Sequence, residues 1–288
     1  MRKRILITGA NGQVGSELRA LEATYPQYKM TFLERSVLDL SETHKIEAYF
    51  NANKFDVVLN CAAYTAVDKA ESEEDMSHKV NYRAVEVMAM CAKRDDFSLV
   101  HISTDYVFDG SHYKPYNESE PTNPQGAYGS SKLYGEEAIV MCAPKNSIII
   151  RTAWVYSTFG NNFVKTMLRL GKERDSLGVI FDQIGTPTYA RDLAKLILDI
   201  IPEIKNETPE IYHYSNEGVC SWYDFAKAIF EMENIECHVN AIETSEYPTP
   251  ARRPHYGVLN KTKIKKTFNV TIPYWRDSLQ EALKIMEK

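Results

Sequence analysis

The chain has 288 residues, of which 44% are hydrophobic and 25% charged, and its formal net charge is −5. This composition is typical of a globular protein with an extensive core. The mild negative charge without a basic block argues against nucleic-acid binding, and no apolar run is long enough to span a bilayer. Five cysteines without a C-x-x-C pair favour free thiols in a reducing cytoplasm over disulfides or a zinc site.

The first predicted element is a short β-branched strand at residues 3–8. The glycine-rich turn Gly9-Ala-Asn-Gly-Gln-Val-Gly15 and a helical pattern follow it directly. Glycines at this spacing let backbone N–H groups approach a pyrophosphate at a helix N-terminus. Glycine triplets also occur in ordinary strand-to-helix turns, but this position between a strand and a helix is typical of dinucleotide-binding domains. The turn therefore predicts a nucleotide site.

The end of the second predicted strand, residues 30–35, should decide which nicotinamide cofactor is used. An acidic side chain there binds the ribose hydroxyls of NAD, whereas an arginine accommodates the 2′-phosphate of NADP. Glu34 and Arg35 are adjacent, so both cofactors stay open. Residues 37–40 resemble the end of a third strand, where Asp39 could approach the adenine. Asp39 could instead cap the helix that follows, although Ser41 is the better N-cap.

The next apolar strand, within residues 56–65, ends in small residues that would let a flat cofactor lie close to the sheet. Residues 68–75 are acidic and are expected to be solvated. A helix is predicted from Asn81 to Arg94, in which Asn81 either has a role at the site or is only a polar residue at the helix start.

The stretch from His101 to Lys132 carries the strongest chemical signal. An apolar strand ends at Thr104, and Tyr128 and Lys132 lie four residues apart on a predicted helix, so they share one face. A neighbouring ammonium can stabilise a phenolate and make the phenol a usable acid near neutral pH. Tyr-x-x-x-Lys occurs at two other places, but only this copy follows such a strand. His101 lies between apolar strand residues and is interpreted as a satisfied core histidine.

Strands and helices alternate through the rest of the chain. Strands are predicted at 148–156, 178–182 and 211–216, and helices at 161–170, 185–198, 221–230 (capped by Ser221) and 275–286. This alternation predicts an α/β fold, a doubly wound parallel sheet of the Rossmann type with a smaller C-terminal α/β domain. We expect a dinucleotide-binding domain at 1–153, with 179–205 returning to it, and a mainly substrate-binding domain from 154–178 and 206–288.

Five motifs together resemble the extended short-chain dehydrogenases/reductases. They are Thr8–Gly15, Asn60–Thr65, Ser103–Gly110, Tyr128–Lys132 and Arg252–Pro254. The glycine turn and Tyr-x-x-x-Lys are shared by that whole superfamily, whereas Ser-Thr-Asp-Tyr-Val-Phe-Asp-Gly with Arg-Arg-Pro is similar to its nucleotide-sugar 4-keto reductases. The resemblance covers essentially the whole chain. It implies reduction of the C4 keto group of dTDP-4-dehydro-L-rhamnose to dTDP-L-rhamnose with NADPH, and with NADH tolerated.

The resemblance also implies roles for single residues. Tyr128 would protonate the C4 oxygen, Lys132 would lower the pKa of Tyr128 and hold the nicotinamide ribose, and Thr104 would hydrogen-bond the same oxygen. The expected cofactor contacts are Gly9, Asn11, Gly12, Gln13, Val14, Gly15, Glu34, Arg35, Asp39, Leu40, Ala62, Ala63, Tyr64, Thr65, Tyr128 and Lys132. The expected substrate contacts are Thr104, Asp105, Tyr128, Trp154, Arg252 and Arg253, the two arginines gripping a diphosphate.

Several alternatives stay open. Trp154 is equally well explained as a core aromatic. For Arg252 and Arg253 the alternative is a solvated basic pair. The protein could be another nucleotide-sugar reductase or epimerase, or a non-catalytic NADP-binding regulatory subunit of methionine adenosyltransferase. No histidine or cysteine spacing predicts a metal site, although the resemblance leaves room for Mg²⁺ at surface carboxylates. A homodimer and a cytoplasmic location are expected, without membrane or nucleic-acid partners.

Overall fold

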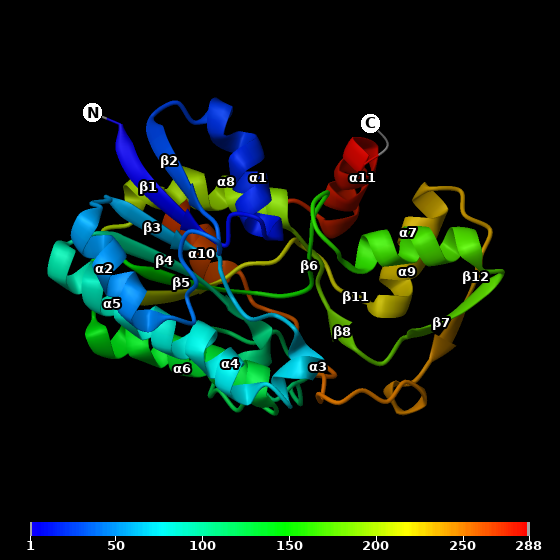
Figure 1. Cartoon of the computed structure of the whole chain (residues 1–288). Helices are drawn as coiled ribbons and strands as arrows, with labels where there is room; N and C mark the ends of the chain where they lie inside the picture. Colours follow the sequence, from blue (N-terminus) through cyan, green and yellow to red (C-terminus); the bar gives the residue numbers. More distant parts are fainter. Residues whose placement is uncertain (1, 287–288) are drawn as a thin grey trace.

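Two α/β units lie side by side in the computed structural model, which describes residues 2–286 (Figure 1). The larger unit is built on a six-stranded sheet with the spatial order β10-β5-β4-β3-β1-β2. All of its neighbouring strands pair in parallel. The strands are β1 (Lys3–Thr8), β2 (Tyr28–Leu33), β3 (Val57–Asn60), β4 (Ser98–Thr104), β5 (Ile148–Thr152) and β10 (Glu210–His213). The predicted α/β fold with a parallel sheet is confirmed.

The strand order reverses at β1, which has β2 on one side and β3 on the other. The loops after β1 and β3 therefore leave the same edge of the sheet in opposite directions, which is where doubly wound sheets bind ligands. This position explains why the glycine-rich turn and the Asn60–Thr65 motif belong to one site.

The third strand that was expected at residues 37–40 does not form. Leu40 is buried and packs in the hydrophobic core. Asp39 Oδ1 accepts the backbone N–H of Ser41 at 2.9 Å and its hydroxyl at 2.8 Å, and this local turn replaces an extended backbone. Ser41 is consequently engaged with Asp39 and is not the N-cap of the next helix, a position held by Glu42.

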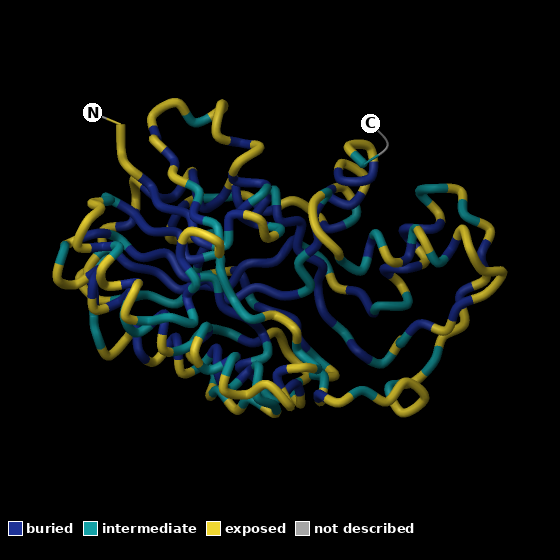
Figure 2. Tube along the Cα trace, viewed as in Figure 1, coloured by how far each residue is buried: buried dark blue, intermediate teal, exposed yellow. Residues whose placement is uncertain are grey.

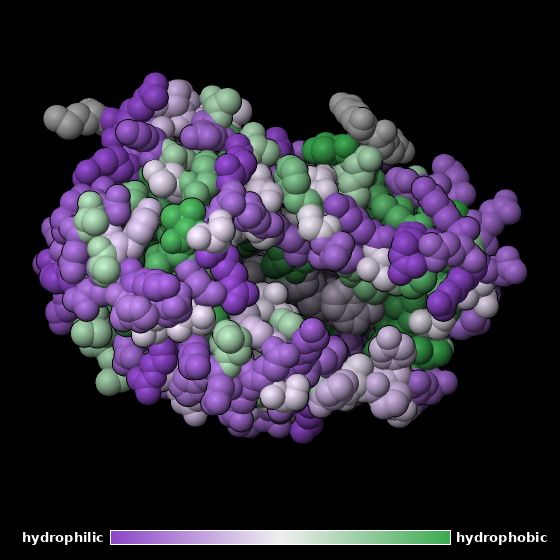
Figure 3. All heavy atoms as spheres, viewed as in Figure 1, coloured by the Kyte–Doolittle hydropathy of each residue, from purple (hydrophilic) through white to green (hydrophobic). Residues whose placement is uncertain are grey.

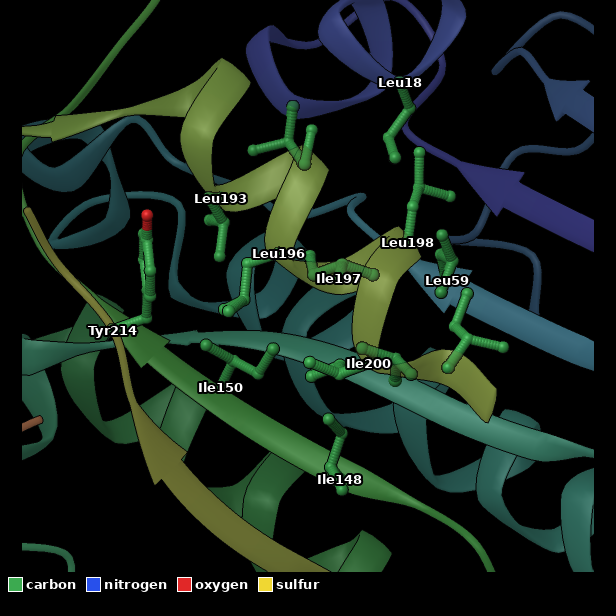
Figure 4. Packing of buried hydrophobic residues seen from close by; sticks show 14 of the residues in the cluster. Leu18, Leu59, Ile148, Ile150, Leu193, Leu196, Ile197, Leu198, Ile200 and Tyr214 are labelled. Atoms are coloured by element: carbon green, nitrogen blue, oxygen red, sulfur yellow. The ribbon is translucent and has the colours of Figure 1, made fainter. Parts of the chain in front are cut away.

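Helices cover both faces of the sheet. One layer contains α1 (Gln13–Leu21), α8 (Ala190–Ile200) and α10 (Thr262–Phe268), and the other contains α2 (Thr43–Ala52), α5 (Ala84–Asp95) and α6 (Ala127–Cys142). Because successive strand residues point to opposite faces, Ile148 and Ile150 pack with the first layer and Ile149 with the second. Figure 4 shows Ile148 and Ile150 against the leucines and isoleucines of α8. The sheet strands are buried along most of their length (Figure 2).

The smaller unit has its own core around Phe225 and Trp275. Its parallel strand pair is β7 (Ser176–Ile180) with β12 (His238–Ile242), and its helices are α7 (Phe163–Glu173), α9 (Trp222–Met232) and α11 (Trp275–Met286). Two short ladders pair β6 (Val155–Tyr156) with β9 (Thr188–Tyr189) and β8 (Ile184–Gly185) with β11 (Cys220–Ser221). Ser221 caps α9 in a capping box with Asp224, so the predicted cap is confirmed.

The division of the chain into two domains stays a prediction, and the packing differs from the expected ranges. Strand β10 and helix α10, both within 206–288, pack into the core of the larger unit through Tyr212 and Phe268. Residues 179–180 belong to β7 of the smaller unit. A four-residue strand such as β10 carries too little pattern for its sheet to be assigned from sequence, since either unit offers an edge.

The remaining helical turns are short. They are η1 (Glu22–Thr24), α3 (Val67–Ala70), α4 (Glu74–His78), the π-helical turn η2 (Lys79–Arg83), η3 (Asp105–Val107), η4 (Ile201–Glu203) and η5 (Thr244–Glu246). Within residues 2–286, the structure contains no helix that is long and apolar enough to cross a membrane.

Candidate active site

The glycine-rich turn forms a backbone cradle at the carboxyl end of β1. Gly9 has a left-handed backbone with φ of 65°, and a Cβ atom there would lie 2.7 Å from the backbone nitrogen of Ala62. A Cβ atom on Gly15 would overlap the carbonyl oxygen of Gly9. Helix α1 begins after Gly12, which has no side chain to cap it, so its first N–H groups face the turn. This cradle fits the pyrophosphate of a dinucleotide.

Gln13 connects this turn to the smaller unit. Its side-chain Nε2 donates to the carbonyl oxygen of Val155 at 3.2 Å, and its Oε1 accepts from Asn162 Nδ2 at 3.1 Å. Val14 is buried, and Asn11 is exposed at the tip of the turn. The Gln13 side chain therefore lies between the two units, and the backbone of the turn is the part that can meet a phosphate.

Glu34 and Arg35, at the end of β2, have different partners. The Glu34 carboxylate lies 3.7 Å from the guanidinium of Arg19, whereas the Arg35 side chain is 75% exposed and lies 3.0 Å from Asp39. Hydrogen bonds from the backbone and hydroxyl of Ser41 and from Arg35 hold the pKa of Asp39 below its usual range. Asp39 is therefore a charged partner of Arg35 in a turn.

Asn81 holds the loop that contains Ala62, Ala63, Tyr64 and Thr65. Its Oδ1 accepts the backbone N–H of Tyr64 at 2.8 Å, and its Nδ2 donates to the Tyr64 carbonyl oxygen at 3.0 Å. The same Nδ2 lies 3.0 Å from the hydroxyl of Ser131, between Tyr128 and Lys132 on α6. Asn81 sits in the π-helical turn, a feature frequent at functional sites. The role that the sequence left open for Asn81 is thus to hold the loop against the helix.

Thr104 and Tyr128 meet at the carboxyl end of β4. Thr104 is the last residue of that strand, and its hydroxyl donates to Asp105 Oδ1 at 3.1 Å. Tyr128 lies in the first turn of α6. Burial raises the pKa of Tyr128 to about 12, and a hydrogen bond with Thr104 opposes this rise. The phenol is thus protonated at neutral pH, as a proton donor must be.

Lys132 lies one turn further along α6 and is 1% exposed. Its Nζ donates to the carbonyl oxygen of Ile102 at 2.6 Å and lies 3.2 Å from His101 Nε2. Burial lowers the pKa of Lys132 to about 8, against the opposing charge of Glu136. In this arrangement burial determines the pKa of Tyr128, and the lowering of that pKa by Lys132 stays a prediction.

Asp105 is a buried carboxyl group beside Thr104. It is 2% exposed, and its Oδ2 has no hydrogen-bond partner among residues 2–286. A Cβ atom at Gly257 would lie 2.5 Å from this Oδ2, so glycine there leaves room for the carboxyl group. Burial raises the pKa of Asp105 to about 7. Near neutral pH the group can therefore donate or accept a hydrogen bond.

Replacing Asp105 by asparagine is expected to flatten the pH dependence of stability. The pKa of about 7 in the folded state exceeds the ordinary value of 3.8, so the folded state binds more protons between these values and loses stability as the pH rises. At about 1.4 kcal/mol per pKa unit, the free energy of unfolding of the wild type falls by on the order of 4 kcal/mol as the pH rises through this range. The variant has no such carboxyl group and should not show this fall. Urea unfolding at about pH 4 and pH 8 measures both losses. Equal losses would contradict the raised pKa.

Trp154 lies between β5 and β6 with a left-handed backbone, φ 50°. Its ring stacks on Trp222, with centroids 3.6 Å apart and planes 12° apart. A Cβ atom on Gly185 would lie 2.7 Å from the ring, so glycine is needed for this close approach. Trp154 therefore packs against the core of the smaller unit and stays partly exposed. Its place in the sugar pocket stays a prediction.

The two arginines of the Arg-Arg-Pro motif are used differently. Arg253 forms a bidentate ion pair with Asp68, with both N···O distances at 2.7 Å. Arg252 is exposed and donates to Gln125 Oε1 at 3.2 Å. Asp68, in the acidic stretch that was expected to be solvated, is 40% exposed and also holds Arg253 through this ion pair. Arg252 is the better placed of the two for a diphosphate, a role that stays a prediction.

Glu71 is a residue that the sequence analysis missed. Its Oε1 accepts the backbone N–H of Ala127 at 2.9 Å, in the first turn of α6 and directly before Tyr128. A carboxylate at a helix N-terminus is stabilised by the helix dipole. No local pattern links Glu71 to a helix that starts far along the chain. Residues 2–286 contain no cluster of three or more His, Cys, Asp or Glu side chains suited to a metal ion.

The sheet, the glycine cradle, and the placement of Thr104 at the end of β4 with Tyr128 and Lys132 on α6 are typical of an extended short-chain dehydrogenase/reductase. The surface is hollowed between the two units (Figure 3). Residues 2–288 match the family model described as the RmlD substrate-binding domain. The chain belongs to this family, which confirms the resemblance seen in the motifs.

Individual relatives are similar over nearly their whole length. The chain is 43% identical to the dTDP-4-dehydrorhamnose reductase of Aggregatibacter actinomycetemcomitans, covering 96% of this chain and 97% of the relative. The solved reductase of the same name from Clostridium acetobutylicum has a TM-score of 0.94 at 41% identity, covering 99% and 100%. The Bacillus anthracis reductase, solved in complex with NADP, has a TM-score of 0.93 at 36% identity, covering 99% and 100%.

Proposed function

We propose that this protein reduces the C4 keto group of dTDP-4-dehydro-L-rhamnose with NADPH and releases dTDP-L-rhamnose. The observation that carries the proposal is the placement of Thr104 at the carboxyl end of β4, hydrogen-bonded to Tyr128, with Lys132 one turn further along α6. Relatives that cover nearly the whole chain at 43% and 41% identity are dTDP-4-dehydrorhamnose reductases. The protein is thus an oxidoreductase of nucleotide-sugar metabolism.

The chain's own residues orient the reactants and handle the proton. When bound, NADPH supplies the hydride. The backbone from Gly9 to Gly15 would hold the pyrophosphate of the cofactor, and the loop from Ala62 to Thr65 would contact it. Tyr128 donates its proton to the C4 oxygen, Thr104 offers its hydroxyl to the same oxygen, and the Lys132 ammonium stabilises the remaining phenolate.

The end of β2 supports NADPH as the preferred cofactor. Arg35 is 75% exposed and presents a guanidinium of the kind that binds a 2′-phosphate, while the Glu34 carboxylate faces Arg19. The Bacillus anthracis relative was solved in complex with NADP. NADH is accepted more weakly, because Glu34 can still turn to the ribose hydroxyls.

The sugar side of the site is made by residues around β4 and the smaller unit. Asp105 helps to position the sugar through Thr104, whose hydroxyl donates to its Oδ1 at 3.1 Å. The partly exposed Trp154 forms a wall, and Arg252 binds the diphosphate. Arg253 acts through its ion pair with Asp68, which fixes the segment that carries Arg252. The Mg²⁺ ion, the homodimer and the cytoplasmic location stay predictions.

The test is an assay of the purified protein with dTDP-4-dehydro-L-rhamnose, following the oxidation of NADPH and NADH in parallel. We expect faster loss of NADPH than of NADH, and dTDP-L-rhamnose as the product identified by NMR. Formation of the C4 epimer would overturn the product assignment. Tight NADPH binding without turnover would favour the regulatory-subunit alternative. A parallel assay with EDTA tests the Mg²⁺ requirement.

A further inference from the structure

A buried chain of polar side chains runs from the end of β1 to Lys132. The Thr8 hydroxyl lies 2.6 Å from the amide oxygen of Asn60, and Asn60 Nδ2 lies 2.9 Å from His101 Nδ1. His101 Nε2 lies 3.2 Å from Lys132 Nζ. Each of these side chains is at most 2% exposed. His101, which the sequence presents as a satisfied core histidine, thus contacts the lysine of the site directly.

His101 is a neutral imidazole. Burial, and then the neighbouring charge of Lys132, hold its pKa well below 6.5. A neutral imidazole has one N–H and one lone pair, whereas an ammonium has only donors. Next to an ammonium, His101 Nε2 must therefore present its lone pair, and Nδ1 must carry the ring proton.

Asn60 can accept the hydrogen bond that His101 Nδ1 then donates. A side-chain amide exchanges its oxygen and nitrogen by rotation, so Asn60 can offer its oxygen to His101 Nδ1 and its nitrogen to Thr8 Oγ1 over the same two distances. The Thr8 hydroxyl can donate or accept. The hydrogen bonds from Thr8 through Asn60 to His101 can therefore reverse their donors and acceptors as the charge of Lys132 requires.

We propose that His101 is a positioning residue that fixes Lys132 Nζ through its Nε2 lone pair and stabilises the ammonium. The inference rests on the proposed function, in which that ammonium faces the Tyr128 phenolate. The second partner of Nζ is the carbonyl oxygen of Ile102 at 2.6 Å, on the same strand as His101. Two acceptors from β4 thus fix the ammonium in place without a buried countercharge in contact with it.

The other titratable groups around Lys132 do not replace His101 as a hydrogen-bond acceptor for the ammonium. The charge of Glu136 on α6 raises the pKa of Lys132, against the lowering by burial, and Cys61 after β3 would do the same only as a thiolate. Glu136 is itself ion-paired with Arg151 at 2.7 Å. Burial raises the pKa of Cys61 to about 12, so this thiol is neutral at neutral pH. His101 is the neutral acceptor in this set.

The first test compares His101→Phe with His101→Gln. Phenylalanine removes the acceptor. Because hydrogen bonds from charged donors are the stronger ones, the charged form of Lys132 loses more stabilisation than its neutral form. The pKa of Lys132 should then fall by about one unit, which moves the alkaline limb of the kcat–pH profile downward. Since the ammonium fraction at pH 7 then falls from about nine-tenths to about one-half, we expect kcat to fall by roughly 2-fold at pH 7 and by roughly 10-fold at pH 9. Glutamine keeps an amide oxygen and should shift the limb by less than half as much.

A second variant, Asn60→Asp, is expected to shift the pKa of Lys132 in the opposite direction. Asn60→Asp places a carboxylate beside Nδ1, keeps the ring proton there and leaves the Nε2 lone pair facing Lys132. The pKa of Lys132 should rise in this variant. A fall would overturn the proposal, and this holds even if His101→Phe does not fold.

The readout that does not depend on turnover is an NMR titration of ¹³Cε-labelled lysine, with the Lys132 signal assigned by Lys132→Arg. Its midpoint is expected near 8 in the wild type, lower in His101→Phe and higher in Asn60→Asp. Val100→Ala, a core substitution on the same strand, should lower the melting temperature and leave the midpoint unchanged. An unchanged midpoint in His101→Phe, or equal shifts in all variants, would overturn the proposal. A wild type that titrates as expected but reduces no 4-keto sugar would instead contradict the proposed function.

Discussion

Replacement of Tyr128 by phenylalanine is expected to lower kcat by about 10²–10⁴-fold and to leave NADPH binding nearly unchanged. The Tyr128 ring packs edge-on against Tyr106, with centroids 5.5 Å apart, and phenylalanine preserves this contact. Only the hydroxyl is lost, and with it the proton for the C4 oxygen. Because a proton donor acts in the transition state, the loss should appear in kcat rather than in the KM for the nucleotide sugar.

The measurement is steady-state reduction with NADPH, together with NADPH binding by fluorescence. Tyr223→Phe is the matched control, since Tyr223 belongs to another Tyr-x-x-x-Lys sequence, on α9 in the smaller unit. It should reduce the sugar at the wild-type rate. A Tyr128→Phe variant with wild-type kcat would show that another group supplies the proton.

The parts of the site that the sequence predicts well are local. The cradle from Gly9 to Gly15 follows from one strand–turn–helix segment, and the common face of Tyr128 and Lys132 follows from one helix. In both cases the residues that act together are close in sequence. Backbone geometry then places them without any knowledge of the tertiary contacts.

The parts that the sequence does not predict depend on contacts between distant segments. Asp68 looks like one member of an acidic run, and only the tertiary fold brings the Arg253 guanidinium within 2.7 Å of it. His101 is indistinguishable from an ordinary buried histidine until α6 places Lys132 Nζ 3.2 Å away. The missing strand at 37–40 has another cause, because the Asx turn at Asp39 competes locally with an extended backbone.

The ion pair between Glu136 and Arg151 is expected to be the most costly contact to break. The two side chains are 2% and 3% exposed, and Arg151 Nη2 lies 2.7 Å from Glu136 Oε2. Ser103, which precedes Thr104, donates its hydroxyl to the same carboxylate at 2.5 Å. The pair therefore ties α6 to β4 and β5 at the end of the sheet where the site lies.

Glu136→Gln should lower the free energy of unfolding by about 3–5 kcal/mol, because the Arg151 guanidinium is left buried without its countercharge. The exposed neighbour provides the control: Glu137→Gln should change stability by no more than about 0.5 kcal/mol. Urea unfolding of both variants at one pH measures the difference. Similar small losses in the two variants would show that the guanidinium finds other compensation.

The double replacement Glu136→Leu with Arg151→Met tests whether charge burial is the cause. Each single replacement leaves one charge in a dry interior, whereas the double variant leaves none, so the double variant should be more stable than either single variant. Ser103 loses its acceptor in the double variant as in Glu136→Leu alone, so this loss cancels in that comparison. If the two single losses simply added, the carboxylate and the guanidinium would each be stabilised independently, and the pair would not be the reason for their burial.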